Sequence, residues 1–208
     1  MSKPSARERI LDIAETAVLA KGFAATSIDE IVAELQITKS GFFYHFHDKN
    51  ALALGLLARY SGRLHDLLEA TFGPARRQNV DPLEVLLGGL THLAEHMARM
   101  PGGHPGCLLA SLSYQDRLFD REVRAKVTAT VRQWNAYFTG LVEDVVAAHR
   151  PSRPIDAARL ARSICCAIDG GIVMSKSLGR PEVLPEQMLM VRDYVHLLFA
   201  AQPVAYAA

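Results

Sequence analysis

The sequence is poor in the features that mark secreted, membrane and metal-binding proteins. Only three cysteines occur among 208 residues, and two of them, Cys165 and Cys166, are adjacent. This spacing fits neither a secreted disulfide framework nor a zinc site. No apolar run approaches the roughly 18 residues that span a bilayer, and the N-terminal stretch MSKPSARERI has no apolar signal core. We therefore expect reduced thiols, no cofactor and a cytoplasmic protein.

Signals for a β-sheet and for catalysis are also missing. The sequence has no strand-like alternation, internal repeat, glycine-rich phosphate loop or nucleophile elbow. The segment HLAEH, from His92 to His96, matches the H-x-x-E-H spelling of inverted zinc peptidases, in which two histidines hold a metal. Five-residue spellings recur by chance, and no acidic third ligand stands out downstream. We predict an all-α protein that is not an enzyme and has no metal site.

Overall charge gives no indication of a nucleic-acid partner. The formal net charge is only +1, and acidic residues slightly outnumber basic ones in the first fifty positions. DNA binding must therefore depend on where individual charges stand.

The stretch from Ser27 to Asn50 has the pattern of a helix-turn-helix. Apolar residues recur at helical spacing behind Ser27, whose side chain can cap a helix start. After a three-residue turn, Thr38 can cap a second short helix. Two helices joined by so short a turn cross steeply, as in DNA-binding helix-turn-helix motifs.

The second of these helices has a small, polar N-terminal turn, Lys39-Ser40-Gly41. Such a tip allows close approach to base edges, and the helix dipole favours a phosphate there. Tyr44 and His45 can donate hydrogen bonds to phosphate oxygens, and Lys49 begins the next helix. The pattern predicts a helix that enters the major groove of double-stranded DNA.

The segment KGFAATSIDEIVAELQITKSGFFYHFHDKNAL, from Lys21 to Leu52, resembles the DNA-binding segment of TetR-family transcriptional repressors. That segment is usually written G-F-x-x-T-S/T, then a turn, then T-L-Y-Y-H-F-x-x-K. Three positions depart from it: Gln36 replaces the usual turn glycine, Val32 stands where alanine is common, and Phe43 lacks the hydroxyl of the first tyrosine. The resemblance implies an N-terminal three-helix DNA-binding domain followed by a helical ligand-binding and dimerisation domain.

We place the DNA-binding domain at residues 1–50 and the ligand-binding and dimerisation domain at residues 51–208. The predicted DNA-binding residues are Thr26, Ser27, Thr38, Lys39, Ser40, Gly41, Phe42, Tyr44, His45 and Lys49. Phe43 is expected to pack instead.

Helical periodicity and glycine- or proline-rich breaks predict about nine helices. One runs from Pro4 to Lys21, and a long one runs from Asp48 to about Ala70, before a loop over Phe72–Val80. The others, apart from the two of the helix-turn-helix, are predicted at Asp81–Met100, Cys107–Arg117, Arg121–Ala148, Ile155–Leu178 and Pro185–Ala201.

The last two predicted helices have more apolar surface than one domain needs to cover. We therefore predict a homodimer through a four-helix interface, which suits a palindromic operator; the alternative is a purely intramolecular core. The predicted interface residues are Ile164, Ile168, Ile172, Val191, Val195 and Leu198.

The middle helices contain polar and aromatic residues suited to a mostly apolar pocket: His92, His96, Cys107, Tyr114, Trp134 and Tyr137. In TetR-like proteins a small molecule in such a pocket disfavours DNA binding, so a ligand-responsive repressor is implied. Cys107 starts a helix after Gly106, which can make a thiol reactive towards an electrophilic or oxidising inducer. Two alternatives stay open: Cys107 as inert packing, and a DNA-binding scaffold without ligand control.

Overall fold

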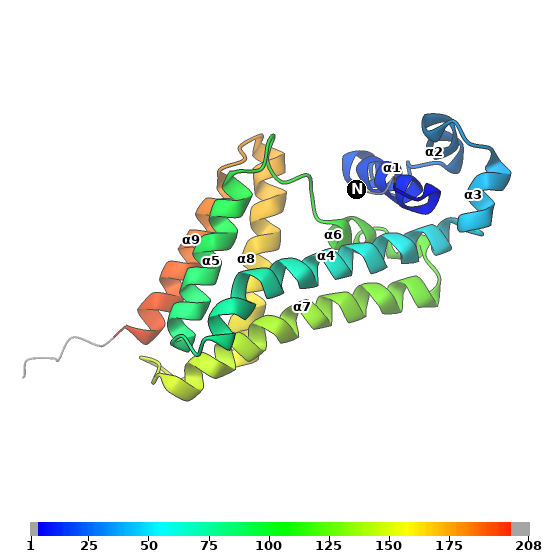
Figure 1. Ribbon diagram of the computed structural model, residues 1–208. Coiled ribbons are helices and arrows are strands. Elements are labelled where there is room, and N and C mark those ends of the chain that lie inside the picture. The colour runs from blue at the N-terminus through cyan, green and yellow to red at the C-terminus, as the bar shows by residue number, and fades with distance from the viewer. Residues whose placement is uncertain (1–3, 201–208) are drawn as a thin grey trace, which may run out of the picture. The chain divides into compact units, whose positions relative to one another are not determined.

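The computed structural model describes residues 4–200, and helices are the regular secondary structure of that range (Figure 1). They are α1 (Ala6–Lys21), α2 (Ile28–Leu35), α3 (Lys39–His45), α4 (Lys49–Arg77), α5 (Pro82–Ala98), α6 (Leu108–Ser113), the 3-10 helix η1 (Asp116–Leu118), α7 (Arg121–Ala148), α8 (Ala157–Leu178) and α9 (Val183–Phe199). The all-α prediction with about nine helices is confirmed for these residues. Ala201, the expected end of the last helix, lies outside them. Within residues 4–200 no helix is long and apolar enough to cross a membrane.

The chain forms two compact units. The first contains the chain up to His65 together with Pro105–Arg132, and the second contains Asp66–His104 and the chain from Gln133 onward. Because α4 and α7 each contribute to both units, neither unit is one continuous stretch. The predicted domain division at residue 50 stays a prediction.

The first unit contains the helix-turn-helix, and its caps are those that the sequence predicts. The Ser27 hydroxyl accepts a hydrogen bond from Glu30 N, and the Thr38 hydroxyl accepts one from Gly41 N. Between the two helices Gln36 adopts a left-handed conformation, with φ 54° and ψ 41°. A side chain in this region costs about 1 kcal/mol or more relative to glycine. The steep turn therefore forms without the glycine that the family pattern would place there.

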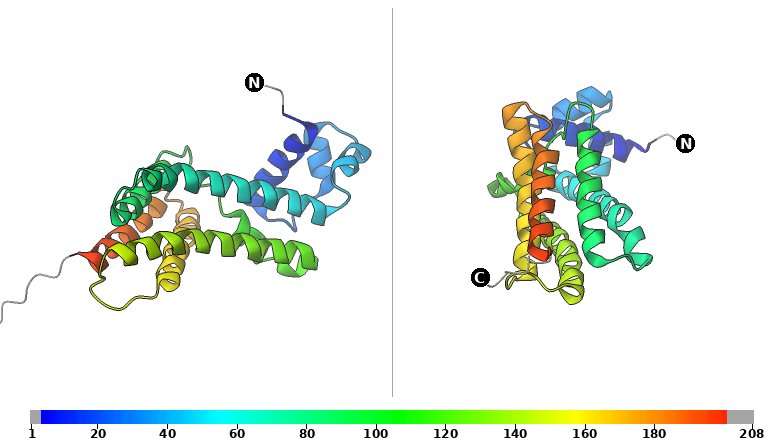
Figure 2. Two further views of the ribbon diagram at one scale, coloured as in Figure 1. Left: turned by 60° about the horizontal axis from the view of Figure 1, so that its bottom comes forward. Right: turned by 90° about the vertical axis from the view of Figure 1, so that its left-hand side faces the viewer.

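In the second unit α9 packs between α5 and α8 (Figure 2). The buried residues Leu184, Met188 and Val195 line the inner side of α9. Gly171 of α8 permits the close approach, since a Cβ there would lie 3.0 Å from Leu184 Cδ1, whereas Gly170 faces open space.

One predicted loop is helical. α4 continues through Gly73 and Pro74 to Arg77, although a loop was expected from Phe72. The fully buried ring of Phe72 lies 5.8 Å from the ring of Phe138. This contact fixes the end of α4 by tertiary packing, and Pro74 is exposed, so packing outweighs the local breaker signal.

The position of the Phe72 ring predicts how a substitution at Gly89 of α5 changes the stability of the protein. A Cβ on Gly89 would lie 2.0 Å from a ring carbon of Phe72, whereas a Cβ on the neighbouring Gly88 meets nothing within 4 Å. We expect Gly89→Ala to destabilise the protein by about 1–3 kcal/mol through overpacking, despite the helix propensity of alanine. Gly88→Ala should stabilise it by up to about 1 kcal/mol.

Urea unfolding of the two variants beside the wild type measures both effects. Destabilisation by Gly88→Ala as large as that by Gly89→Ala would show that the Phe72 contact is not the cause.

Candidate DNA-binding site

The N-terminal turn of α3 presents an exposed, small and polar surface. Thr38, Lys39 and Ser40 are exposed, and Gly41 is half-buried. Lys39 Nζ lies 2.6 Å from Asp29 Oδ1, and both side chains are more than 60% exposed. Exposed ion pairs contribute about 0–1 kcal/mol, so Lys39 can exchange this partner for a phosphate or a base at little cost.

The aromatic residues of α3 divide between core and surface. Phe42 is fully buried and Phe46 nearly so, with ring centroids 5.9 Å apart, whereas Tyr44 is 85% exposed. The prediction that Phe42 contacts DNA is therefore wrong for its side chain, and Phe43, expected to pack, is 45% exposed. The reason is helical geometry: positions 42 and 46 are one turn apart and share the inner face. His45 is half-buried, and its ring centroid lies 5.0 Å from that of Tyr44.

The two residues that precede α2 shape the backbone. Thr26 is buried, and its hydroxyl donates a hydrogen bond to Gly22 O at 2.9 Å. Ser27 is exposed, and its oxygen caps α2. The side chain of Thr26 thus closes the turn, and Ser27 remains a surface residue whose DNA contact stays a prediction.

Lys49, predicted to bind a phosphate, has a partner inside the unit. Its Nζ donates to Phe23 O at 3.0 Å and lies 4.7 Å from the centroid of the Phe23 ring. Burial lowers the pKa of Lys49, because it disfavours the charged form. An ammonium group has three donors, so a phosphate contact remains compatible with this geometry and stays a prediction.

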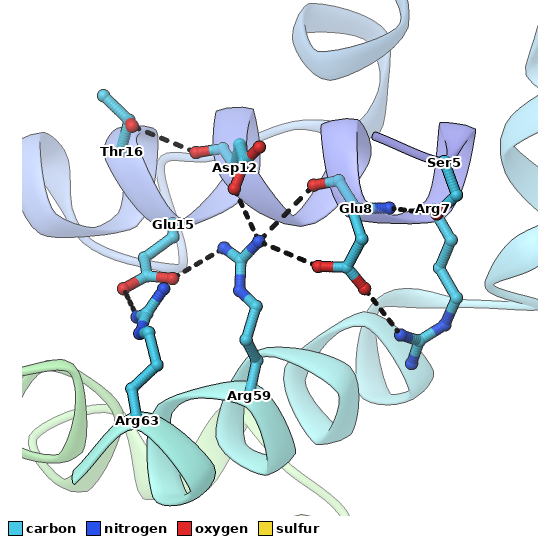
Figure 3. Close-up of polar contacts among 8 residues, drawn as sticks. All are labelled: Ser5, Arg7, Glu8, Asp12, Glu15, Thr16, Arg59 and Arg63. Atoms are coloured by element: carbon cyan, nitrogen blue, oxygen red, sulfur yellow. Dashed lines mark hydrogen bonds and ion pairs between the residues drawn. The ribbon is translucent and has the colours of Figure 1, made fainter. Parts of the chain in front are cut away.

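A charged network joins α1 to α4 (Figure 3). The Arg59 guanidinium donates to Asp12 Oδ1 at 2.6 Å and to Glu15 Oε2 at 2.7 Å, and Arg63 bonds the other oxygen of Glu15. Burial alone would lower the pKa of Arg59, but the hydrogen bonds and charges of Glu15 and Asp12 outweigh it and raise the pKa.

This network was not predicted, although its signal is present in the sequence. Glu8, Asp12 and Glu15 share one face of α1 at spacings of four and three residues, and Arg59 and Arg63 are one turn apart on α4. Acidic and basic faces of this kind on two helices indicate a contact between them.

The predicted ligand residues lie in different environments. His92, His96 and Tyr114 are exposed, and Tyr114 is 82% exposed. Trp134 is buried. Tyr137 is half-buried, its hydroxyl donates to Leu68 O at 3.1 Å, and burial together with Glu69 raises its pKa to about 12.

Two pockets of the second unit have volumes of about 450 Å³ and 430 Å³. The first lies around Arg76, Val85 and Asp144, and the second lies around Arg153, Arg159 and Tyr194. Neither contains any of the six predicted ligand residues. Over residues 4–200, no group of three or more histidine, cysteine or acidic side chains could hold a metal ion.

The predicted dimer residues belong to the core of the second unit. Ile164, Ile168, Ile172, Val195 and Leu198 are buried and Val191 is half-buried. The exposed apolar residues of the same helices are instead Val173, Met174, Leu178, Met190, Tyr194 and Leu197. The predicted set is therefore corrected: the most regular apolar stripe of each helix packs within the chain.

Cys107 is buried and is the N-cap residue of α6. Its Sγ accepts a hydrogen bond from Ala110 N at 3.4 Å and lies 3.7 Å from the hydroxyl oxygen of Tyr60. Cys165 is buried and Cys166 exposed. Burial raises the pKa of Cys165 to about 12, with smaller contributions from Cys166 and Asp169.

Comparisons with known proteins agree along most of the chain. Residues 10–56 match the family described as bacterial regulatory proteins, tetR family, and residues 85–189 match the tetracyclin repressor-like C-terminal domain. The transcriptional regulator AcuR of Cereibacter sphaeroides is 24% identical over 164 residues, which are 79% of this chain and 73% of AcuR.

Solved structures show the same fold. The regulatory protein TetR of Rhodobacter sphaeroides is 24% identical with a TM-score of 0.75, over 91% of this chain and 99% of that chain. The reduced form of Escherichia coli NemR is 19% identical with a TM-score of 0.75, over 95% of this chain and 98% of that chain.

The α1–α4 network leads to a prediction for Arg59. Arg59→Met leaves the mostly buried carboxylate of Glu15 with Arg63 as its remaining cation, so we expect a loss of about 2 kcal/mol in unfolding free energy. Arg63, whose side chain is 51% exposed, provides the control. Arg63→Met should cost less than about 1 kcal/mol. Urea unfolding measures both, and equal losses would contradict the assigned role of Arg59.

Proposed function

The chain belongs to the TetR family of bacterial transcriptional regulators, and on this premise we propose that it represses transcription as a homodimer bound to a palindromic operator. We further propose that a small-molecule or electrophilic inducer releases it. The observation that carries the proposal is the exposed polar tip of α3. A helix that only packs against the rest of the protein does not need such a surface.

The geometry of α3 suits the major groove. The helix has seven residues, of which the first three, Lys39, Ser40 and Gly41, include no aromatic or branched side chain. Its N-terminus attracts phosphate. Lys39 and Ser40 are assigned to base edges or adjacent phosphates. Tyr44 and His45 are assigned to the DNA backbone, where their donors can bond phosphate oxygens.

The outer faces of α8 and α9 support a homodimer. Met190 and Leu197 of α9 are 66% and 68% exposed, and Met174 of α8 is 50% exposed. Burying these side chains against a second copy would stabilise the pair at about 25 cal/mol per Å² of apolar surface. A twofold dimer presents two copies of α3, and it would recognise half-sites whose centres are one helical turn of DNA, or a multiple, apart. A dimer so placed represses by blocking access to the promoter.

The position of Cys107 supports an electrophilic inducer. Its thiol caps the first turn of α6 and lies 3.7 Å from the hydroxyl oxygen of Tyr60. Because Cys107 is 5% exposed, an added group cannot fit without moving the start of α6. An inducer releases DNA only if it favours a conformation that binds the operator less tightly.

Binding to the DNA upstream of its own gene tests the proposed function. The wild type should bind one specific fragment, and its affinity should fall steeply with salt. Tyr44→Phe removes one hydroxyl that is assigned to a phosphate, so we expect about tenfold weaker binding. Tyr114→Phe, which removes an equally exposed hydroxyl from α6's C-terminal end, should leave the affinity unchanged. Failure of the wild type to bind any duplex at low salt would overturn the proposal.

N-ethylmaleimide tests Cys107 as the inducer site. The thiolate adds across the maleimide double bond, forming a carbon–sulfur bond, and the neighbouring carbon takes up a proton. We expect the reagent to release wild-type protein from the operator, whereas Cys107→Ser should bind the operator and resist release.

Cys166→Ser is the control, because Cys166 is exposed and reacts without involving α6. It should be released like the wild type. Equal release of Cys107→Ser and wild type would assign Cys107 to packing.

A further inference from the structure

The turn between α1 and α2, residues Gly22–Thr26, is held by a side chain distant in sequence. Gln115, just before η1, accepts a hydrogen bond from Ala24 N through its Oε1 at 2.9 Å. Phe23 and Phe119, which belong to the same two segments, pack with their ring centroids 4.8 Å apart. All these residues belong to the first unit. We call this set of contacts the turn clasp.

The shape of the turn fits the amide of Gln115. Gly22 has φ 86°, and a Cβ there would lie 2.8 Å from Gln115 Nε2. Within the turn, Thr26 N donates to Phe23 O, so the turn's own backbone bond does not use Ala24 N. Gln115 supplies the acceptor for that amide. Its side chain lies so close to Gly22 that a side chain at position 22 would displace it.

The segment that contains Gln115 also contacts the part of the chain that follows α3. Asp120 N donates to Asn50 Oδ1 at 3.3 Å, and Asn50 is the second residue of α4. The segment from Gln115 to Asp120 therefore contacts the chain before α2 and the chain after α3. Its contacts constrain both ends of the helix-turn-helix.

We propose that Gln115 is a positioning residue for DNA binding, which fixes the helix-turn-helix through Ala24 without touching the DNA. The proposal rests on the proposed function. The turn leads directly into Ser27, the cap of α2, and α2 fixes α3 through the short Gln36 turn. A change in the turn therefore alters the direction in which α3 faces the groove.

Two substitutions separate the hydrogen bond from the bulk of the side chain. Gln115→Leu keeps the approximate size but removes the acceptor, and Gln115→Glu keeps an acceptor for Ala24 N. Because glutamate also adds a negative charge, Ser113→Glu serves as its control, since Ser113 is exposed at the end of α6. The full-length protein is used throughout, with fluorescence anisotropy on the operator fragment and hydrogen exchange at the Ala24 amide.

We expect Gln115→Leu to weaken operator binding about threefold to tenfold, the effect of one lost hydrogen bond. Gln115→Glu, compared with Ser113→Glu, should bind within about twofold. The Ala24 amide should exchange faster in Gln115→Leu than in the wild type and remain protected in Gln115→Glu. Rescue by glutamate would not be expected of a residue that only fills space.

Two results would overturn the inference while leaving the proposed function intact. One is operator binding by Gln115→Leu equal to that of the wild type. The other is binding by Gln115→Glu, after correction for charge, as weak as that of Gln115→Leu. Loss of all binding by the wild type is a different outcome, since it overturns the proposed function itself.

Discussion

The burial of Phe42 decides which surface α3 presents to solvent. A helix of seven residues is too short to be stable in water by itself, so α3 depends on its cap and on tertiary contacts. Phe42 and Phe46 anchor one face of α3 in the core of the first unit. With that face fixed, Tyr44 and the polar first turn must point outward, because side chains on a helix advance by about 100° per residue. The proposed DNA-binding surface thus depends on an apolar contact in the core of the first unit.

Polar contacts between segments that are distant in the sequence also stabilise the helix-turn-helix region of the first unit. Arg59 of α4 joins the carboxylates of α1, and Gln115 holds the turn that leads into α2. The two kinds of contact differ physically. Arg59 is mostly buried and charged, so its loss leaves the mostly buried carboxylate of Glu15 with one cation fewer. Gln115 makes a neutral hydrogen bond at a half-buried site, so its loss changes geometry at a smaller cost in stability.

The sequence predicted correctly those features that depend on interactions between neighbouring residues. The caps at Ser27 and Thr38 were predictable, because capping residues act on the adjacent turn. The roles of Phe42 and Phe43 were not, since two adjacent aromatic residues fit the core equally well until the crossing of α2 and α3 is known. The end of α4 was also missed, because Phe72 is fixed by a residue far away in the sequence. The same holds for the dimer face, where periodicity identifies the strongest apolar stripe but not the partner it packs against.

α6 lies between Cys107, the proposed inducer site, and Gln115, the proposed positioning residue. The helix has six residues, which at 1.5 Å per residue is about 9 Å. Its first turn is capped by sulfur, a weaker acceptor than the oxygens that cap α2 and α3. Gln115 lies two residues after the last residue of α6, and its Oε1 accepts a hydrogen bond from Ala24 N. A group added to the buried Cys107 would have to move the start of α6, and the contact of Gln115 with Ala24 follows directly after the other end of the same short helix.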